Sequence, residues 1–193
     1  IYSTGIPYLQ GNLMKQYSFH YGEGQVDFSL DESRVIQELH MAETPVLANP
    51  EGDILKALDN PIDSKPLKDL VNIGNTVCIL ANDTTRVANT HVFMPIILDY
   101  LNRCGVEDKD ICILFALGTH RDMTYEEMVG EVGEEAASRV AMYNSSCKKT
   151  EDFVNLGTTS FGTPVIINKL AVEADVLIAT GSVVHHFFAG FGG

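Results

Sequence analysis

Polar and titratable side chains gather in three short segments of this sequence, residues 83–86, 118–121 and 181–186. The first holds an aspartate, two threonines and an arginine, the second a histidine and an arginine, and the third ends in two histidines. Hydroxyls, backbone N–H groups and a guanidinium suit a phosphate, whereas imidazoles, which titrate near neutral pH, suit proton transfer. Together, the three segments favour an anionic ligand and acid–base chemistry.

The first segment has the composition of a phosphate-binding turn before a helix. Thr84, Thr85 and Arg86 would contact the phosphate, and Asp83 is available for sugar hydroxyls. The alternative is a capping aspartate that pairs with the arginine on a solvated turn. The spacing alone leaves both interpretations open.

The other two segments supply histidines. His120 precedes Arg121, so an imidazole would lie beside a group able to bind a carboxylate; a surface histidine is the alternative. His185 and His186 are adjacent, and consecutive side chains of an extended backbone point to opposite faces, so we expect one of them to reach a ligand. The phenylalanines at 187–188 would then form apolar walls that exclude water, although ordinary core packing would also explain them.

Each segment follows a predicted buried strand, and the strands are what would bring the segments together. Apolar runs predict strands at residues 76–81, 110–117, 164–167 and 175–180, and spacing and capping signals predict helices around 93–101, from Thr124 onward, and at 169–174. This alternation predicts an α/β fold with a mostly parallel sheet and helices on both faces. Ligands of such sheets bind outside the carboxyl ends of the strands, where all three segments would lie.

The first third of the chain gives weaker signals. Residues 25–30 alternate between apolar and polar side chains as an edge strand does, and residues 31–41 are compatible with a short helix. Two further helical patterns follow a proline-bearing connector, at 52–58 and 65–71. We therefore expect an N-terminal extension over residues 1–50 and one α/β domain over residues 51–193.

Composition narrows the range of partners. The chain has 193 residues and a formal net charge of −13, so nucleic acid and anionic membrane surfaces would repel it. No apolar run reaches the ~20 residues that a bilayer requires. The four cysteines form no C-x-x-C pair, which favours free thiols and a cytoplasmic location. The sequence contains no Walker motif, no G-x-S-x-G motif, and no G-x-G-x-x-G after a predicted strand.

Three motifs in this order resemble those of the lactate racemase family, the nickel-pincer-nucleotide-dependent racemases and epimerases of 2-hydroxy acids. Residues 82–86 (NDTTR) are similar to the family's D-x-T-R motif, residues 118–121 (GTHR) to its G-x-H-R motif, and residues 186–191 (HFFAGF) to its H-F-F-A-G-F motif. The resemblance covers roughly residues 55–193 and is most specific in the third motif. It implies a Rossmann-like N-terminal domain that faces a C-terminal domain across the active site.

The resemblance also implies a cofactor and its binding residues. The family binds a nickel pincer nucleotide, a pyridinium mononucleotide whose ring carbon and sulfur atoms hold nickel. Asp83 and Arg86 would contact the ribose and phosphate, with Thr84 and Thr85 as helpers.

The implied reaction needs an acid or base on each face of the substrate, and His120 and His186 would be that pair. One histidine removes the hydroxyl proton while hydride passes to the cofactor, and the other returns a proton after the flat 2-oxo acid has turned over. Arg121 would hold the substrate carboxylate. The substrate itself stays open among lactate, malate, aromatic hydroxy acids and sugar acids.

The sequence departs from the family's pattern at Gly193. In the family, an Arg-Lys pair follows the glycine turn, and its lysine anchors the cofactor; a later histidine ligates nickel. Because the chain stops before these positions, no metal ligand is assigned, and we expect a truncated domain that is inactive by itself. The alternatives are a non-catalytic α/β domain that binds a phosphate or nucleotide, and an acidic interaction module.

Overall fold

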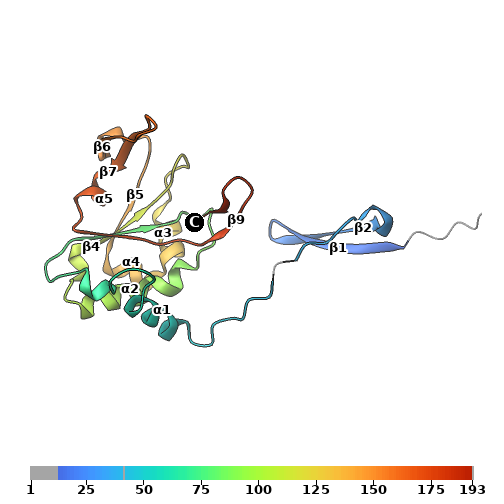
Figure 1. Ribbon diagram of the computed structural model, residues 1–193, viewed down its shortest axis with the longest axis horizontal. Coiled ribbons are helices and arrows are strands. Elements are labelled where there is room, and N and C mark those ends of the chain that lie inside the picture. The colour runs from blue at the N-terminus through green and yellow to red at the C-terminus, as the bar shows by residue number, and fades with distance from the viewer. Residues whose placement is uncertain (1–12, 41, 193) are drawn as a thin grey trace, which may run out of the picture. The chain divides into compact units, whose positions relative to one another are not determined.

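The computed structural model describes residues 13–40 and 42–192, in two compact units that divide between Val46 and Leu47 (Figure 1). The first unit is a β-hairpin of β1 (Met14–Tyr21) and β2 (Gly24–Asp31), which turns at Gly22 with φ of 60°. The rings of Tyr17 and Phe19 stack on Phe28 across the two strands, at centroid distances of 5.6 and 5.3 Å. Such cross-strand aromatic pairs stabilise a two-stranded ribbon.

The helix expected at 31–41 was wrong. Among the described residues of this stretch, only the 3₁₀ turn η1 (Glu32–Arg34) forms, with Asp31 as its cap. Position 41 lies outside the described residues. The carboxylate of Glu38 instead pairs with Lys15 and accepts a hydrogen bond from Tyr17, which holds the segment against the hairpin. Long-range contacts of this kind override weak local propensity.

The second unit is built on four parallel strands in the order β5-β4-β3-β8, which confirms the predicted α/β class. Its strands are β3 (Val77–Ala81), β4 (Ile111–Phe115), β5 (Ala141–Asn144) and β8 (Val176–Ala179). The predicted strand at 164–167 also forms, but as β7 (Pro164–Asn168) it pairs antiparallel with β6 (Phe153–Thr158) outside this sheet. Pro164 has no backbone N–H, which suits the end of a short hairpin better than the interior of a sheet.

Five helices and three 3₁₀ turns lie within the described part of the second unit. They are α1 (Pro50–Asp59), α2 (Thr90–Arg103), α3 (Tyr125–Val132), α4 (Glu134–Arg139), α5 (Lys169–Glu173), η2 (Leu67–Asp69), η3 (Asp108–Asp110) and η4 (Thr150–Asp152). The capping box expected at Thr124 is present: the Thr124 hydroxyl accepts from the N–H of Glu127, whose carboxylate accepts from the N–H of Thr124. None of these helices is long and apolar enough to cross a membrane.

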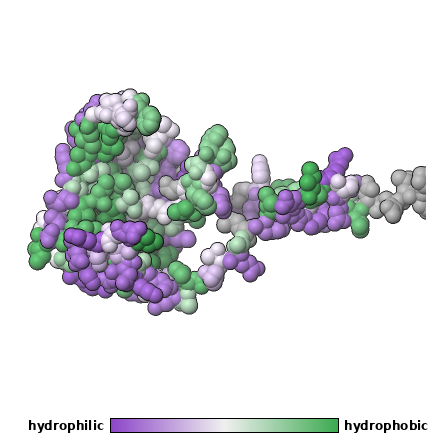
Figure 2. Space-filling view, in the orientation of Figure 1, coloured by the Kyte–Doolittle hydropathy of each residue, from purple (hydrophilic) through white to green (hydrophobic). Residues whose placement is uncertain are grey.

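The two faces of the sheet are covered unequally. On one face, alternate residues of β3 and β4 pack with α2, α3 and α4 into the main core, where Ile79, Leu98 and Ile113 are fully buried. The opposite face carries a smaller cluster of Cys78 and Leu114 packed against Ala171 of α5. Helices thus flank both faces, as predicted. Figure 2 shows hydrophobic residues at the surface of this unit, and Leu177 of β8 is 48% exposed.

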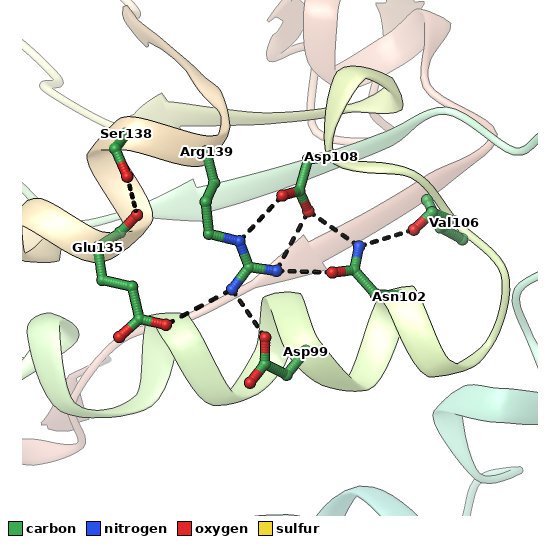
Figure 3. A network of polar contacts seen from close by, with 7 residues as sticks. All are labelled: Asp99, Asn102, Val106, Asp108, Glu135, Ser138 and Arg139. Atoms are coloured by element: carbon green, nitrogen blue, oxygen red, sulfur yellow. Dashed lines mark hydrogen bonds and ion pairs between the residues drawn. The ribbon is translucent and has the colours of Figure 1, made fainter.

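A polar network around Arg139 fixes the edge of the sheet from which the strands start. The Arg139 guanidinium, with an 18% exposed side chain, binds Asp108 of η3 at 3.0 Å and Asp99 and Asn102 of α2 at 2.8 and 2.7 Å (Figure 3). Since η3 leads directly into β4, this network ties α2 and α4 to the amino end of that strand. The network lies at the end of the sheet opposite the carboxyl ends of the strands, and its role is structural.

Candidate active site

The segments after β3, β4 and β8 leave the sheet at one edge, because these three strands are parallel neighbours. Backbone hydrogen bonds continue the ladder beyond the strands: Ala116 N–H donates to Ala81 O at 2.8 Å, and Thr180 N–H donates to Leu80 O at 3.0 Å. The sequence therefore correctly predicted that the three polar segments begin at a common edge.

Two cavities lie at this edge and share a wall. A cavity of about 300 Å³ is lined by Asp83, Thr85 and His120 among others, and a second of about 520 Å³ is lined by Ser182, His186 and Phe187 among others. Asn82 and Arg86 line both cavities. The two histidines singled out from the sequence thus lie in adjoining cavities on either side of one turn.

Asp83 is the buried member of the first cavity, with 5% of its surface exposed. Its Oδ1 accepts from the N–H of Thr85 at 3.0 Å and from its hydroxyl at 2.5 Å, and its Oδ2 lies 2.5 Å from Nδ1 of His120. Burial alone would raise the pKa of Asp83, but the hydrogen bonds from Thr85 and His120 outweigh it and hold that pKa below its ordinary value. The carboxylate is therefore ionised at neutral pH.

The arginine of the same turn has a different environment. The backbone N–H of Arg86 closes the turn on Asp83 O at 3.1 Å, and its exposed guanidinium makes no ion pair or hydrogen bond with any described residue. The alternative in which Asp83 pairs with Arg86 on a solvated turn is therefore wrong, because Asp83 pairs with His120 instead. A guanidinium left unpaired beside two cavities suits an anionic group. Thr84 is exposed.

Arg121 is already engaged. Its guanidinium forms a bidentate ion pair with Glu127 of α3, at 2.8 and 2.5 Å, and this bond lowers the pKa of Glu127 to about 2. Arg121 thus extends the cap of α3 and is not among the residues that line the two cavities. Binding of a substrate carboxylate by Arg121 would require this ion pair to break.

The third segment folds into a hairpin of β9 (Val184–His186) and β10 (Gly190–Gly192). The His185 ring packs on Phe191 at 4.8 Å, while His186 lines the larger cavity. One histidine of the pair thus reaches the cavity, as the alternation of an extended strand predicts. Nδ1 of His186 accepts from the N–H groups of Phe188 and Ala189, both at 3.2 Å.

The aromatic walls expected after His186 do not exclude water. Phe187 and Phe188 pack on each other at 4.2 Å between ring centroids but stay 87% and 85% exposed. Asn82 and Ser182, which lie in the segments singled out from the sequence but were assigned no role, also line the cavities. Asn82 directly follows a predicted strand, and this position was the signal available for it. Among the described residues, no group of three His, Cys, Asp or Glu side chains is placed to hold a metal ion.

The fold and the site define a Rossmann-like α/β domain that carries a turn with an unpaired arginine and two imidazoles beside the carboxyl edge of its parallel sheet. Residues 21–193 match the family described as lactate racemase N-terminal domain. The chain belongs to this family.

Similar proteins agree with this assignment. A lactate racemase from Thermoanaerobacterium thermosaccharolyticum is 34% identical over 93% of the chain and 42% of the relative, and one from Lactiplantibacillus plantarum is 39% identical over 72% of the chain and 32% of the relative. The solved lactate racemase apoprotein from T. thermosaccharolyticum superposes with a TM-score of 0.77 at 33% identity, over 93% of this chain and 42% of that one. A Thermotoga maritima protein shares the fold, with a TM-score of 0.59 and 24% identity over 74% and 36% of the two chains. The chain thus spans less than half the length of these relatives.

Proposed function

We propose that this chain is the cofactor-binding N-terminal part of a nickel-pincer-nucleotide-dependent racemase or epimerase of 2-hydroxy acids, with His120 and His186 as its acid/base pair. One observation carries the proposal: His120 and His186 line adjoining cavities that share Arg86 as a wall. Racemisation through a planar 2-oxo acid removes the hydroxyl proton on one side and restores one on the other, and two imidazoles on either side of one turn meet that need. Membership in the lactate racemase family supports it.

The residues at the edge fit the nucleotide part of such a cofactor. Arg86, whose guanidinium is unpaired among the described residues, and the exposed hydroxyl of Thr84 would hold a phosphate, while Thr85 donates its N–H and its hydroxyl to Asp83. When bound, the cofactor supplies the acceptor and donor of hydride. No group of three His, Cys, Asp or Glu side chains in the described part of the chain is placed to hold a metal ion, and the family resemblance puts the nickel-ligating histidine after the third motif.

The proposed reaction divides its proton transfers between the two cavities. One imidazole would take the proton from the substrate hydroxyl as hydride leaves the carbon, and the other would give a proton to the same oxygen as hydride returns to the other face of the planar 2-oxo acid. We further propose that residues 1–50 are an extension of the domain at 51–193, that a C-terminal domain completes the enzyme, and that it works in the cytoplasm.

The test is substitution of each histidine in the intact, cofactor-loaded protein. His120→Ala and His186→Ala should each lower the rate of lactate racemisation by about 10²-fold or more, while the bound cofactor, measured by its absorbance, is retained. His91→Ala, on α2 outside the two cavities, is the control and should keep its rate. Full racemisation by either cavity variant would rule out that histidine as an acid/base group, whereas no racemisation by the intact, loaded, unsubstituted protein would favour a phosphate-binding domain without catalysis.

A further inference from the structure

The Asp83 carboxylate is shared between its own turn and the segment after β4. Its side chain is 6% exposed, and its two oxygens have separate partners. Oδ1 accepts both hydrogen bonds from Thr85, and Oδ2 faces Nδ1 of His120 at 2.5 Å. With both oxygens engaged by protein groups, Asp83 is poorly placed for the contact with ribose hydroxyls that the sequence suggested.

The charge of Asp83 decides where the proton of His120 lies. Hydrogen bonds from Thr85 and His120 overcome the cost of burial and keep the pKa of Asp83 below its ordinary value, so the carboxylate is an anion at neutral pH. An ionised carboxylate only accepts hydrogen bonds, so Nδ1 of a neutral His120 carries the proton and its lone pair is on Nε2. The side chain of His120 is 50% exposed and lines the smaller cavity, which leaves Nε2 accessible.

We infer that Asp83 is a positioning residue that holds His120 in the Nδ1–H tautomer and orients Nε2 to accept the substrate's hydroxyl proton. This inference rests on the proposed racemase function. His186 provides an internal contrast, because its Nδ1 faces the backbone N–H groups of Phe188 and Ala189 and no carboxylate. Of the two histidines, only His120 is therefore oriented by Asp83.

The turn makes Asp83→Asn a sharp probe of this role. The N–H of Thr85 needs an acceptor, so the amide oxygen of the new side chain should keep the place of Oδ1. The amide nitrogen then takes the place of Oδ2 and donates to Nδ1 of His120, which drives the proton to Nε2. The variant should thus invert the tautomer of His120 while a side chain of the same size stays at position 83.

The experiment combines ¹⁵N NMR of histidine-labelled intact protein with steady-state kinetics of the cofactor-loaded enzyme. Asp83→Asn should shift His120 from the Nδ1–H to the Nε2–H pattern, leave the pattern of His186 unchanged, and lower kcat by about 10²-fold or more with KM and cofactor content nearly unchanged. Asp175→Asn is the matched control, since Asp175 also accepts from the N–H and hydroxyl of a threonine, Thr76, but contacts no histidine in the described chain. It should keep both the tautomer and kcat.

Several results would overturn the inference. An Nε2–H His120 in the unsubstituted protein would do so without any variant, which covers the case in which Asp83→Asn fails to fold. Loss of cofactor with unchanged kcat per bound cofactor would make Asp83 a ribose ligand, and an unchanged kcat with an inverted tautomer would remove it from the reaction. Failure of the proposed function is a separate result, because an active His120→Ala variant would exclude racemisation through His120 whatever the NMR pattern.

Discussion

Two arginines of similar sequence context have opposite surroundings. Arg86 and Arg121 each close a polar segment after a strand, yet the Arg86 guanidinium is unpaired among the described residues while Arg121 is bound by Glu127. An arginine that already has a bidentate carboxylate gains little from a second anion. At the scale of single residues, we therefore propose Arg86, and not Arg121, as the arginine that binds the ligand.

Arg86→Gln should lower the affinity of the intact apoprotein for a pyridinium mononucleotide by roughly 10- to 100-fold, because it removes a charge-assisted hydrogen bond worth about 1.5–3 kcal/mol. Titration calorimetry measures this directly. Arg121→Gln is the control and should bind the nucleotide like the parent protein. Equal losses in both variants would show that net charge, and not the turn, determines binding.

Sequence reasoning located the site residues but not their pairing. Parallel strands end at a common edge, so the sequence alone predicted that His120, His186 and Arg86 lie near one another. The partnership of Asp83 with His120 could not, because the two residues are 37 positions apart and their contact depends on how deeply Asp83 is buried. The engagement of Arg121 was equally hidden, although Glu127 had been recognised as a capping residue.

At the scale of elements, structure that depends on local signals was predicted well from the sequence. Structure that depends on long-range pairing was predicted poorly. The start of α3 was predictable because its capping box lies within four residues of sequence. Strand β5 was missed, since its four residues gain their stability from pairing with β4 and carry no pattern of their own. The helix expected at 31–41 does not form, because contacts with Tyr17 and Lys15 of β1 hold Glu38 against that strand.

The cap of α3 gives a pH-dependent prediction. The ion pair with Arg121 and the N–H of Thr124 lower the pKa of Glu127 from 4.5 to about 2, so its stabilising contribution is present above about pH 5 and is lost as the pH falls towards 2. Glu127→Gln should therefore lower the urea midpoint at pH 7, and the gap to the parent protein should close by pH 2–3.

The neighbouring carboxylate of Glu126, which makes no ion pair in the described chain, provides the matched control for this helix. Glu126→Gln should leave the urea midpoint nearly unchanged at both ends of the pH range. A gap for Glu127→Gln that stays constant from pH 7 to pH 3 would show that the ionised form of Glu127 does not stabilise the cap.

At the scale of the whole molecule, the chain covers 42% of the T. thermosaccharolyticum relative and 32% of the L. plantarum one. The family resemblance places the anchoring lysine and the nickel-ligating histidine after the H-F-F-A-G-F motif, and the described residues offer no metal site in their place. We propose that this chain supplies the groups that hold the nucleotide and the acid/base pair, and that catalysis needs further residues of the protein.

The 193-residue chain alone should show no racemisation of lactate and no covalently bound cofactor, whereas the intact protein should show both. Chiral chromatography of lactate and mass spectrometry of the protein measure these two properties. Circular dichroism of the isolated chain, expected to report mixed helix and strand, is the control for folding. Turnover by the isolated chain would contradict the expectation.

The turn at residues 82–86 lines both cavities through Asn82 and Arg86, so it would position a bound ligand relative to both histidines. It continues directly from β3, a central strand of the sheet. A core substitution that slides β3 by a fraction of an ångström would misalign a bound molecule with both imidazoles at once, and errors of about 1 Å can cost about 10²-fold in rate. Some inactivating substitutions should therefore be found among the buried hydrophobic residues of β3, none of which lines either cavity.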